Sequence, residues 1–390
     1  MHQVKHRRAL NQRRAFTLGA LLALAALGLG ASFSPAAVTS TGTTTPQPAA
    51  IEPAGPAIPQ PKKQKLTPTR LTALPPSTIT NATAPLRIRF SGPPAPNSPA
   101  PTLTPSVAGK WSTAGDFQYF TPVSTLEPCS SYQLTIWARS VAVGHAILGQ
   151  RRTIGLRIAC PPTDALQQAL ARLGYLPYTF HSSHGVHLPS GAESRSLAAR
   201  HAYRPPAGHL VASFGGVPAL QYGVMDATTR GAVMVYQAAH GLEMSGAAEL
   251  HTWASLLAAE TSNSRDRVPY TYVTVSESSP ETLEVHRGSH VALSSPANTG
   301  VAGAETATGT FPIFARYTST TMSGTNPDGT KYKDPGVPWV NYFNGGDAVH
   351  GFPRPSYGSP QSNGCVELPI STAQEVYAML QIGDIVIVRG

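Results

Sequence analysis

Two residues near the C-terminus have side chains suited to covalent chemistry. Cys365 is the third and last cysteine of the 390-residue chain, and His350 lies 15 positions before it. A thiol attacks carbonyl groups as its thiolate, so a catalytic cysteine needs a neighbouring base or positive dipole that lowers its pKa. A histidine can supply that base. The pair therefore predicts a cysteine nucleophile with a histidine base.

The N-terminal segment predicts where this chemistry takes place. Basic residues precede an uncharged run over residues 15–38: Lys5, Arg7, Arg8, Arg13 and Arg14. This is the outline of an export signal, and residues 13–18 also resemble a twin-arginine signal. The run is also long enough to cross a bilayer as an uncleaved anchor. We predict an export signal or membrane anchor at residues 1–38, with the remaining chain outside the cytoplasm.

An exported location changes the interpretation of the three cysteines. In an oxidising compartment, two of them would pair and one would remain free. Cys129 and Cys160 fall within one candidate domain, whereas Cys365 is far away in another. We therefore predict a Cys129–Cys160 disulfide and a free Cys365. The alternative is that Cys129 and Cys160 are buried thiols.

Length and composition indicate several domains and an anionic partner. At 41.0 kDa the chain exceeds one usual hydrophobic core, and its 37 prolines with 13% charged residues favour linkers and β-rich modules. The net charge of +9 would suit nucleic acid, a membrane surface or an anionic cell wall. Much of that charge lies in the first fifteen residues, and no basic helix or aromatic pattern is typical of nucleic-acid binding. We expect no nucleic-acid partner.

Residues 39–79 are rich in Pro, Thr and Ala, which predicts an extended linker.

From Leu86 the hydrophobic pattern has a period of two, as in half-buried strands. Residues 86–90 and 132–136 show it most clearly. Together with the recurring prolines and Trp111, residues 80–160 resemble a bacterial Ig-like domain. The resemblance implies a β-sandwich that acts as a spacer.

Residues 161–262 have a helical period instead. Leu166, Leu170 and Leu173 share one helical face, and Gly174 can end that helix. We predict a second helix beginning near residues 226–229 and a third near Thr252. The segment resembles the peptidoglycan-binding helical domain, which implies a small three-helix fold that binds glycan. A Gly/Ser/His-rich insert, about residues 179–220, separates the first helix from the others.

Histidines of the insert could suggest zinc, namely His181, His184, His187 and His201. However, the segment is rich in Ser and Gly, has no cysteine, and offers only Glu193 as an acid between those histidines. We predict a solvated loop and no metal site.

The β pattern returns at Tyr270 and continues to the C-terminus. We predict strands near residues 270–275, 308–313, 339–343 and 384–388, with His350 in the turn that follows the third. One helix is expected from Thr372, with Glu375 completing a capping box, to a stop at Gly383. This predicts a mostly β domain with one short helix after Cys365.

Three motifs occur in order in this domain: residues 308–312 (TGTFP), 343–351 (FNGGDAVHG) and 362–369 (SNGCVELP). Over residues 268–390 they resemble the YkuD-type L,D-transpeptidase catalytic domain. The resemblance implies attack by a cysteine on a peptidoglycan tetrapeptide stem, between the diamino acid at position three and D-alanine at position four. D-Alanine leaves, and the thioester passes its acyl group to an amine, giving a 3→3 cross-link. We expect no cofactor, and a monomer.

The resemblance also implies residue roles. Cys365 is the nucleophile, His350 the base, and the backbone carbonyl of Gly351 orients the imidazole. The N–H groups of Gly364 and Cys365 are the expected oxyanion donors, because a glycine before the nucleophile lets the backbone approach the substrate. Ser362 is expected to stabilise the turn.

Other positions near the motif depart from the family or need a separate interpretation. Asn363 and Glu367 stand where the family usually has His, and Arg or Asn, respectively. Asn363 is expected to affect substrate positioning, and Glu367 to place negative charge where a cation helps to hold substrate carboxylates. Asp347 is expected to be a surface-turn acid, and Trp339 a core residue.

Two other functions fit the same sequence. The chain could be a wall-binding protein with a weakened or inactive catalytic domain, or an L,D-carboxypeptidase that uses the same cysteine with water. The acceptor amine also stays open, because cross-linking, D-amino-acid exchange and attachment of a wall protein all discharge the same thioester.

Overall fold

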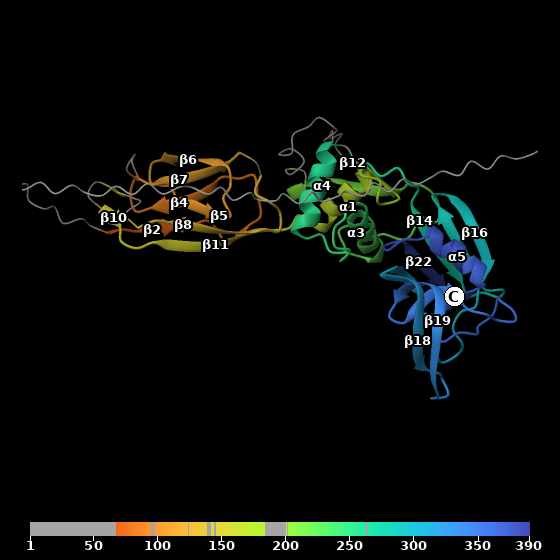
Figure 1. Cartoon of the computed structure of the whole chain (residues 1–390). Helices are drawn as coiled ribbons and strands as arrows, with labels where there is room; N and C mark the ends of the chain where they lie inside the picture. The colour runs from red at the N-terminus through yellow and green to blue at the C-terminus, as the bar shows by residue number, and fades with distance from the viewer. Residues whose placement is uncertain are drawn as a thin grey trace, which may run out of the picture. The chain divides into compact units, whose positions relative to one another are not determined.

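The computed structural model describes residues 68–390 except 95–97, 124, 139–141, 144–145, 184–199, 201 and 263 (Figure 1). All of these belong to one compact unit, Lys63–Gly390. The predicted export signal and residues 39–67 of the predicted linker lie outside the described residues. Within the part of the chain that is described, no helix is long and apolar enough to cross a membrane.

Two four-stranded sheets form the first part of the described chain. One has the order β2-β4-β7-β6, and the other β3-β11-β8-β5. Their strands are β2 (Leu71–Ala73), β3 (Thr78–Ile79), β4 (Leu86–Phe90), β5 (Thr102–Thr104), β6 (Gly109–Ala114), β7 (Phe117–Pro122), β8 (Ser131–Ile136) and β11 (Arg152–Ile158). A smaller sheet joins β1 (Pro68–Thr69), β10 (Ala146–Leu148) and β9 (Ala142–Val143).

The period-two pattern places alternate side chains in one core. β4 alternates buried and exposed residues along its whole length, and β8 does so with one half-buried position. Side chains of both sheets, including Phe90, Leu134 and Ile158, form a single buried cluster. The predicted linker boundary was wrong, because β2 and β3, within residues 39–79, already pair with β4 and β11. Leu71 and Ile79 give these short strands apolar side chains that join the cluster.

Three helices follow the two sheets: α1 (Thr163–Arg172), α3 (Ala227–Ala239) and α4 (Leu250–Ser262). They pack around a buried cluster that contains Leu166, Tyr236 and Trp253. Asp226 caps α3 by accepting a hydrogen bond from the Thr229 N–H at 2.7 Å. α4 begins at Leu250, two residues before the predicted start.

The insert between α1 and α3 is not a solvated loop at its ends. Strands β12 (Tyr178–Ser182) and β13 (Gly208–Ala212) form an antiparallel hairpin in which His181 lies opposite His209. Of the other insert histidines, His184, His187 and His201 lie outside the described residues. Within the described ranges, no group of His, Cys, Asp or Glu side chains could hold a metal ion.

The C-terminal part contains two further sheets. The first has the order β16-β15-β14-β22-β17 and the second β18-β19-β20-β21. Their strands are β14 (Thr271–Ser276), β15 (Thr282–Arg287), β16 (His290–Pro296), β17 (Gly309–Pro312), β18 (Ala315–Thr325), β19 (Lys331–Asn344), β20 (Asp347–Gly351), β21 (Val366–Leu368) and β22 (Ile385–Arg389).

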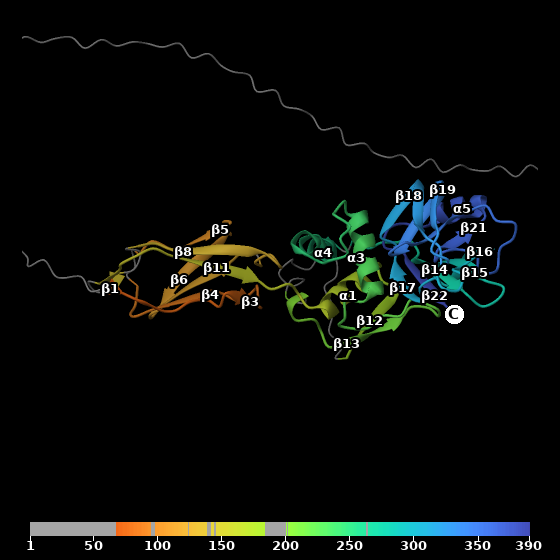
Figure 2. The ribbon, with the colours of Figure 1, turned by 90° about the horizontal axis from the view of Figure 1, so that it is seen from below.

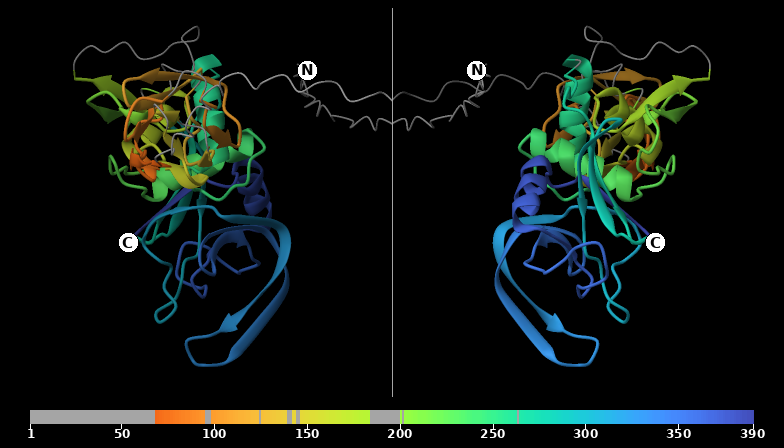
Figure 3. Two further views of the ribbon diagram at one scale, coloured as in Figure 1. Left: turned by 90° about the vertical axis from the view of Figure 1, so that its left-hand side faces the viewer. Right: turned by 90° about the vertical axis from the view of Figure 1, so that its right-hand side faces the viewer.

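Helix α5 (Ile370–Met379) packs against β19 and β20. Side chains of both sheets and of α5, including Val273, Val349 and Val376, form one buried cluster. The long β18–β19 hairpin projects beyond the rest of its sheet (Figure 3). The core therefore fixes β20 and β21, while the hairpin tip lies away from it.

Two local predictions for this region were wrong. Helix α5 starts after Pro369, which has no side-chain cap, so Thr372 lies inside the helix, and the helix ends at Met379, before Gly383. The proline fixes its own φ and leads directly into the first turn. His350 lies within strand β20, not in a turn.

Helix α3 contacts β17 and β22 directly, as Figure 2 shows for α3 and β17. Two glycines permit this approach. A Cβ added to Gly231 would lie 2.4 Å from the carbonyl oxygen of Gly383, and one added to Gly383 would lie 2.5 Å from that of Gly231. The backbones of α3 and of the residue before β22 approach so closely that a side chain at either glycine would clash.

Candidate active site

Strands β20 and β21 bring His350 and Cys365 to one pocket. The strands run parallel with His350 opposite Glu367, and Cys365 directly precedes β21. His350 is buried and Cys365 is half-buried. They line a small pocket of about 60 Å³ whose other residues are Met322, Tyr332, Asp334, Val337, Phe352, Arg354, Asn363 and Glu367.

The imidazole of His350 is oriented by its own neighbour. Its Nδ1 lies 3.0 Å from the carbonyl oxygen of Gly351. Because a carbonyl only accepts, Nδ1 carries the proton in this bond and Nε2 is left as a base. Burial lowers the pKa of His350, while the bond to Gly351 and the charge of Glu367 act in the opposite direction. The imidazole is therefore neutral at rest.

The Cys365 thiol is also neutral at rest. Its Sγ lies 3.6 Å from the carbonyl oxygen of Gly346, to which the thiol donates. Burial raises the pKa of Cys365 to about 12, with smaller contributions from the charges of Asp347 and Glu367, and the Ala348 N–H acts against them. A neutral thiol beside a neutral imidazole can react once the proton moves between them.

The turn before β21 carries Cys365. The Ser362 hydroxyl, which is buried, donates to the Cys365 carbonyl at 2.5 Å across this turn. Gly364 has a φ of +104°, and a Cβ there would lie 2.7 Å from Asp347 Oδ1. Neither the Gly364 nor the Cys365 N–H has a hydrogen-bond partner among the described residues. Both donors are free for a ligand.

Asp347 differs from the expected surface-turn acid. It is half-buried, and its Oδ2 accepts from Asn344 Nδ2 at 3.0 Å and from the Ala307 N–H at 3.5 Å. Burial raises the pKa of Asp347. Its carboxylate lies against Gly364, so it supports the turn that carries Cys365.

A short extended segment over residues 297–301 pairs with both ends of the turn that carries Cys365, residues 362–367, which we call the cysteine turn. Asn298 pairs with Glu367, and Gly300 pairs with Ser362. The buried Glu281 fixes the segment between these points, because its carboxylate accepts from the Thr299 N–H at 2.7 Å and from Thr299 Oγ1 at 2.8 Å. No sequence motif indicates this support, since Glu281 precedes the turn by some 80 residues.

Glu367 does not present an unpaired negative charge to the pocket. Its side chain, 5% exposed, binds Arg354 through two hydrogen bonds of 2.7 and 2.8 Å. Arg354 also donates to the Gln361 carbonyl at 2.9 Å and lies over the Phe352 ring. Arg354 thus brings a guanidinium to the pocket. The sequence does not predict this ion pair, because Arg354 and Glu367 are 13 positions apart and no motif links them.

Three further residues have defined places. Asn363 is exposed and donates through Nδ2 to Asn326 Oδ1 at 2.7 Å, which links the cysteine turn to the β18–β19 hairpin tip. Trp339 packs against the buried cluster, as expected for a core residue. Tyr317 is 49% exposed and its ring contacts Tyr342.

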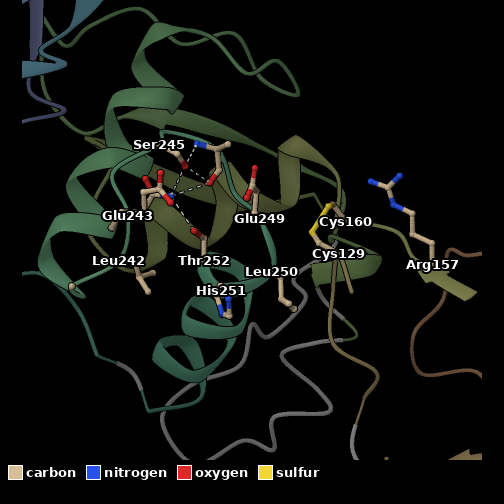
Figure 4. Close-up of a pocket in the computed structure, with 13 residues that line it drawn as sticks. Cys129, Arg157, Cys160, Leu242, Glu243, Ser245, Glu249, Leu250, His251 and Thr252 are labelled. Carbon is tan, nitrogen blue, oxygen red and sulfur yellow. Dashed lines mark hydrogen bonds between the residues drawn. A yellow bond between two sulfur atoms is a disulfide. The ribbon is translucent and has the colours of Figure 1, made fainter. Parts of the chain in front are cut away.

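A second, larger pocket of about 580 Å³ surrounds the Cys129–Cys160 disulfide (Figure 4). The two Cα atoms are 4.4 Å apart, and Cys129 Sγ lies 3.8 Å from the carbonyl oxygen of Ala248. The remaining cysteine, Cys365, is free. Two of the three cysteines are therefore joined in a disulfide, and the third is a free thiol in the pocket of His350.

The fold and this site agree with one class of catalytic domain. Residues 270–388 match the family of the L,D-transpeptidase catalytic domain, YkuD, which confirms the resemblance predicted for residues 268–390. The comparisons do not extend this to the predicted Ig-like and peptidoglycan-binding domains, which stay predictions.

Several solved structures are similar to this chain. The catalytic domain of the E. faecium L,D-transpeptidase is 27% identical and aligns with 32% of this chain and 100% of its own, with a TM-score of 0.29. An L,D-transpeptidase from Mycobacterium smegmatis is 14% identical over 83% of this chain and 100% of its own, with a TM-score of 0.28. L,D-transpeptidase 3 from Mycobacterium tuberculosis, with a faropenem-derived adduct, is 14% identical over 82% and 97%, with a TM-score of 0.29. No curated protein matches the chain.

Proposed function

We propose that this protein is an exported peptidoglycan L,D-transpeptidase that joins stem peptides through a Cys365 thioester. The observation that carries the proposal is the hydrogen bond from His350 Nδ1 to the Gly351 carbonyl, which leaves Nε2 as a base in the pocket of Cys365. A backbone carbonyl thereby fixes the tautomer, a task that an acidic side chain performs in many catalytic triads.

The first half-reaction forms the thioester. As Sγ bonds to the carbonyl carbon of the diamino acid at position three, the thiol proton passes to His350 Nε2. The amide then breaks, and the D-alanine nitrogen takes that proton as it leaves. The neutral resting states of Cys365 and His350 support a proton transfer that accompanies attack.

The second half-reaction uses the same groups in reverse. An amine from another stem attacks the thioester carbonyl and gives a proton to His350 Nε2. The carbon–sulfur bond breaks, and the sulfur recovers its proton from the imidazolium. The product is a new amide, which is a 3→3 cross-link when the amine comes from position three of the acceptor stem.

Both half-reactions pass through a tetrahedral oxyanion. The unpaired N–H groups of Gly364 and Cys365 are its proposed donors. Removal of one such donor typically costs two to three orders of magnitude in rate, about 3–4 kcal/mol. Ser362, Asp347 and the 297–301 segment are positioning groups in this account, because they bind the turn and not the reacting atoms.

Analysis of products distinguishes transfer from hydrolysis. Purified protein is incubated with a tetrapeptide stem, the products are separated, and their molecular masses are measured. We expect a new stem dimer together with released D-alanine, both absent for Cys365→Ala. A shortened monomer without dimer would identify an L,D-carboxypeptidase, and no change with native protein would contradict the proposal.

The helical segment would hold the enzyme on its polymer. Helices α1, α3 and α4 share a core, and α3 contacts β17 and β22 of the catalytic domain, which supports a fixed glycan-binding platform. We expect Cys365→Ala to sediment with insoluble peptidoglycan. A protein that lacks residues 161–262 is not a suitable control, because α3 packs on β17 and β22 and its removal would expose them. Competition by soluble glycan fragments supplies the control, and its failure would argue against specific binding.

A further inference from the structure

The two-sheet region, residues 68–160, carries positive charge that the proposed chemistry does not use. It contains eight Lys and Arg side chains and two Asp and Glu side chains, whereas residues 161–390 contain 13 and 17, respectively. The helical and catalytic parts are therefore acidic, and the two-sheet region is basic. Such an imbalance within one chain points to a partner of negative charge that contacts the two-sheet region.

One outer face of this region gathers cations over three neighbouring strands, β4, β7 and β6 (Figure 1). Because β4 alternates buried and exposed positions, Arg87 and Arg89 both lie on its exposed side. Strand pairing places Tyr119 of β7 opposite Arg87, and Phe117 opposite Arg89. On the other side of β7, β6 adds the exposed Lys110. We call these five residues the basic face.

An aromatic ring holds the two guanidinium groups of the basic face. The Cζ atom of Arg87 lies 4.9 Å from the centroid of the Phe117 ring, and that of Arg89 lies 5.3 Å from it. A guanidinium stacked on a ring keeps the N–H groups of its edge available for a ligand. Since the ring already restricts both side chains, binding through them costs less conformational entropy. The face is thus prepared for an anion.

A single acid offsets the charge of this face. Asp116 accepts a hydrogen bond from Arg89 Nε at 2.8 Å, which leaves the two terminal nitrogens of Arg89 without a partner among the described residues. Arg87 and Lys110 form no ion pair and no side-chain hydrogen bond within the part of the chain that is described. One carboxylate beside three cations leaves a net positive potential, which a bound anion would stabilise.

The shape of the face indicates which kind of anion fits. Phe117 and Tyr119 are half-buried, so neither ring projects as an anchor of the kind that inserts into lipid. Arg87 and Arg89 are two positions apart on one strand, which separates their Cα atoms by about 6.5 Å. A thin chain with one anionic group every few bonds can place successive groups on successive cations. The guanidinium fork matches the oxygens of a phosphate.

We propose that the basic face binds a linear polymer of polyol units joined by phosphodiesters, with its phosphates on Arg87, Arg89 and Lys110. This goes beyond the proposed function, because none of these residues takes part in acyl transfer. The acidic helical and catalytic parts repel the same polymer. The polymer therefore holds the chain by its two-sheet region and leaves the active site for the stem peptide.

The test measures how binding of the purified full chain to poly(glycerol phosphate) depends on salt. The logarithm of the association constant should fall linearly with the logarithm of the NaCl concentration, because each phosphate contact releases counterions. Arg87→Gln combined with Lys110→Gln removes two contacts. We expect about tenfold or more weaker binding at low salt and a slope that is less steep by about one to one and a half.

Matched variants separate the basic face from the general charge of the region. Arg152→Gln combined with Arg157→Gln removes the same charge from exposed positions of β11, in the other sheet, and should weaken binding by at most about threefold. Phe117→Leu keeps every charge but removes the ring, so it should weaken binding without changing the slope. The basic N-terminal segment is present in every variant and does not affect these comparisons.

Several results would overturn the proposal. An equal loss of affinity in the two double variants would mean that the whole region attracts the polymer and that the basic face has no special role. Equal affinity for polyglutamate of the same charge would remove the phosphate from the assignment. Tighter binding to vesicles of phosphatidylglycerol and phosphatidylcholine, lost with Arg87 and Lys110, would replace the polymer by a lipid surface. None of these results depends on D-alanine release.

Discussion

His350 donates its Nδ1 proton to the carbonyl of Gly351, the next residue in strand β20, over 3.0 Å. The orienting group is thus part of the same strand as the base, and the core beneath β20 fixes both together. The orientation of the imidazole therefore does not depend on an acidic side chain. Burial of the imidazole also lowers the pKa of His350, and the pH dependence of the activity measures that shift.

The activity should persist to unusually low pH for a histidine base. Burial lowers the pKa of His350, and catalysis needs the neutral imidazole. The rate is therefore present above this pKa and falls as the pH drops through it. We expect the acid limb of kcat/KM for D-alanine release to have its midpoint below about 6.5, the ordinary value. A midpoint above that value would contradict the neutral resting imidazole.

The free enzyme should have an unreactive thiol. With a pKa of about 12, Cys365 is almost wholly protonated at neutral pH. We expect its alkylation by iodoacetamide to rise about tenfold per pH unit from pH 7 to pH 9, past the ordinary thiol pKa of about 8.5, without a plateau. Cys365→Ala gives the background. A plateau below pH 8 would instead indicate a resting thiolate–imidazolium pair.

Gly364→Ala should impair both activity and stability. The residue has a φ of +104°, and the new Cβ would meet Asp347 Oδ1 at 2.7 Å. We expect a loss of about 1–3 kcal/mol in unfolding free energy and at least about a hundredfold lower acylation rate, because an oxyanion donor moves. Gly345→Ala is the matched control, since its φ is also positive but its Cβ would meet nothing within 4 Å. Equal effects on acylation would argue against the clash.

Glu281→Gln should slow the reaction although Glu281 does not line the pocket. Its carboxylate accepts two hydrogen bonds from Thr299, in the segment that pairs with both ends of the cysteine turn. An amide retains one acceptor, so we expect about 1–3 kcal/mol lower stability. A positioning role further predicts a lower kcat with little change in KM. Glu375→Gln, at an exposed position of α5, is the control. A change in KM alone for Glu281→Gln would contradict positioning.

The sequence predicted that Cys365 and His350 share one site, and it predicted most strands, for clear physical reasons. Alternation of apolar residues marks β4 and β8 because each has one buried face, and Cys365 with His350 stand in an ordered set of motifs. The predicted start of α5 at Thr372 is wrong, because Thr372 and Glu375 have the spacing of a capping box while Pro369 sets the actual start.

Other parts of the site depend on contacts that spacing does not encode. Arg354, which follows β20, meets Glu367 on β21, the strand that pairs with β20. Glu281 meets Thr299 because the pairing of β15 with β16 brings together the residues at the start and the end of this hairpin. From sequence, Glu367 alone suggests an unfavourable charge, and only the fold reveals its partner. The predicted solvated loop is likewise wrong at the ends of the insert, because the Gly- and Ser-rich composition of its middle gives no signal of the β12–β13 hairpin.

The central claim is that Cys365 carries the acyl group of a stem peptide. The most direct measurement is the intact mass of the protein after brief incubation with a tetrapeptide stem, followed by acid quenching. The account predicts an increase equal to the mass of the stem minus the mass of D-alanine, localised to the peptide that contains Cys365 and absent from Cys365→Ala. An unchanged mass, or the same increase in Cys365→Ala, would contradict it.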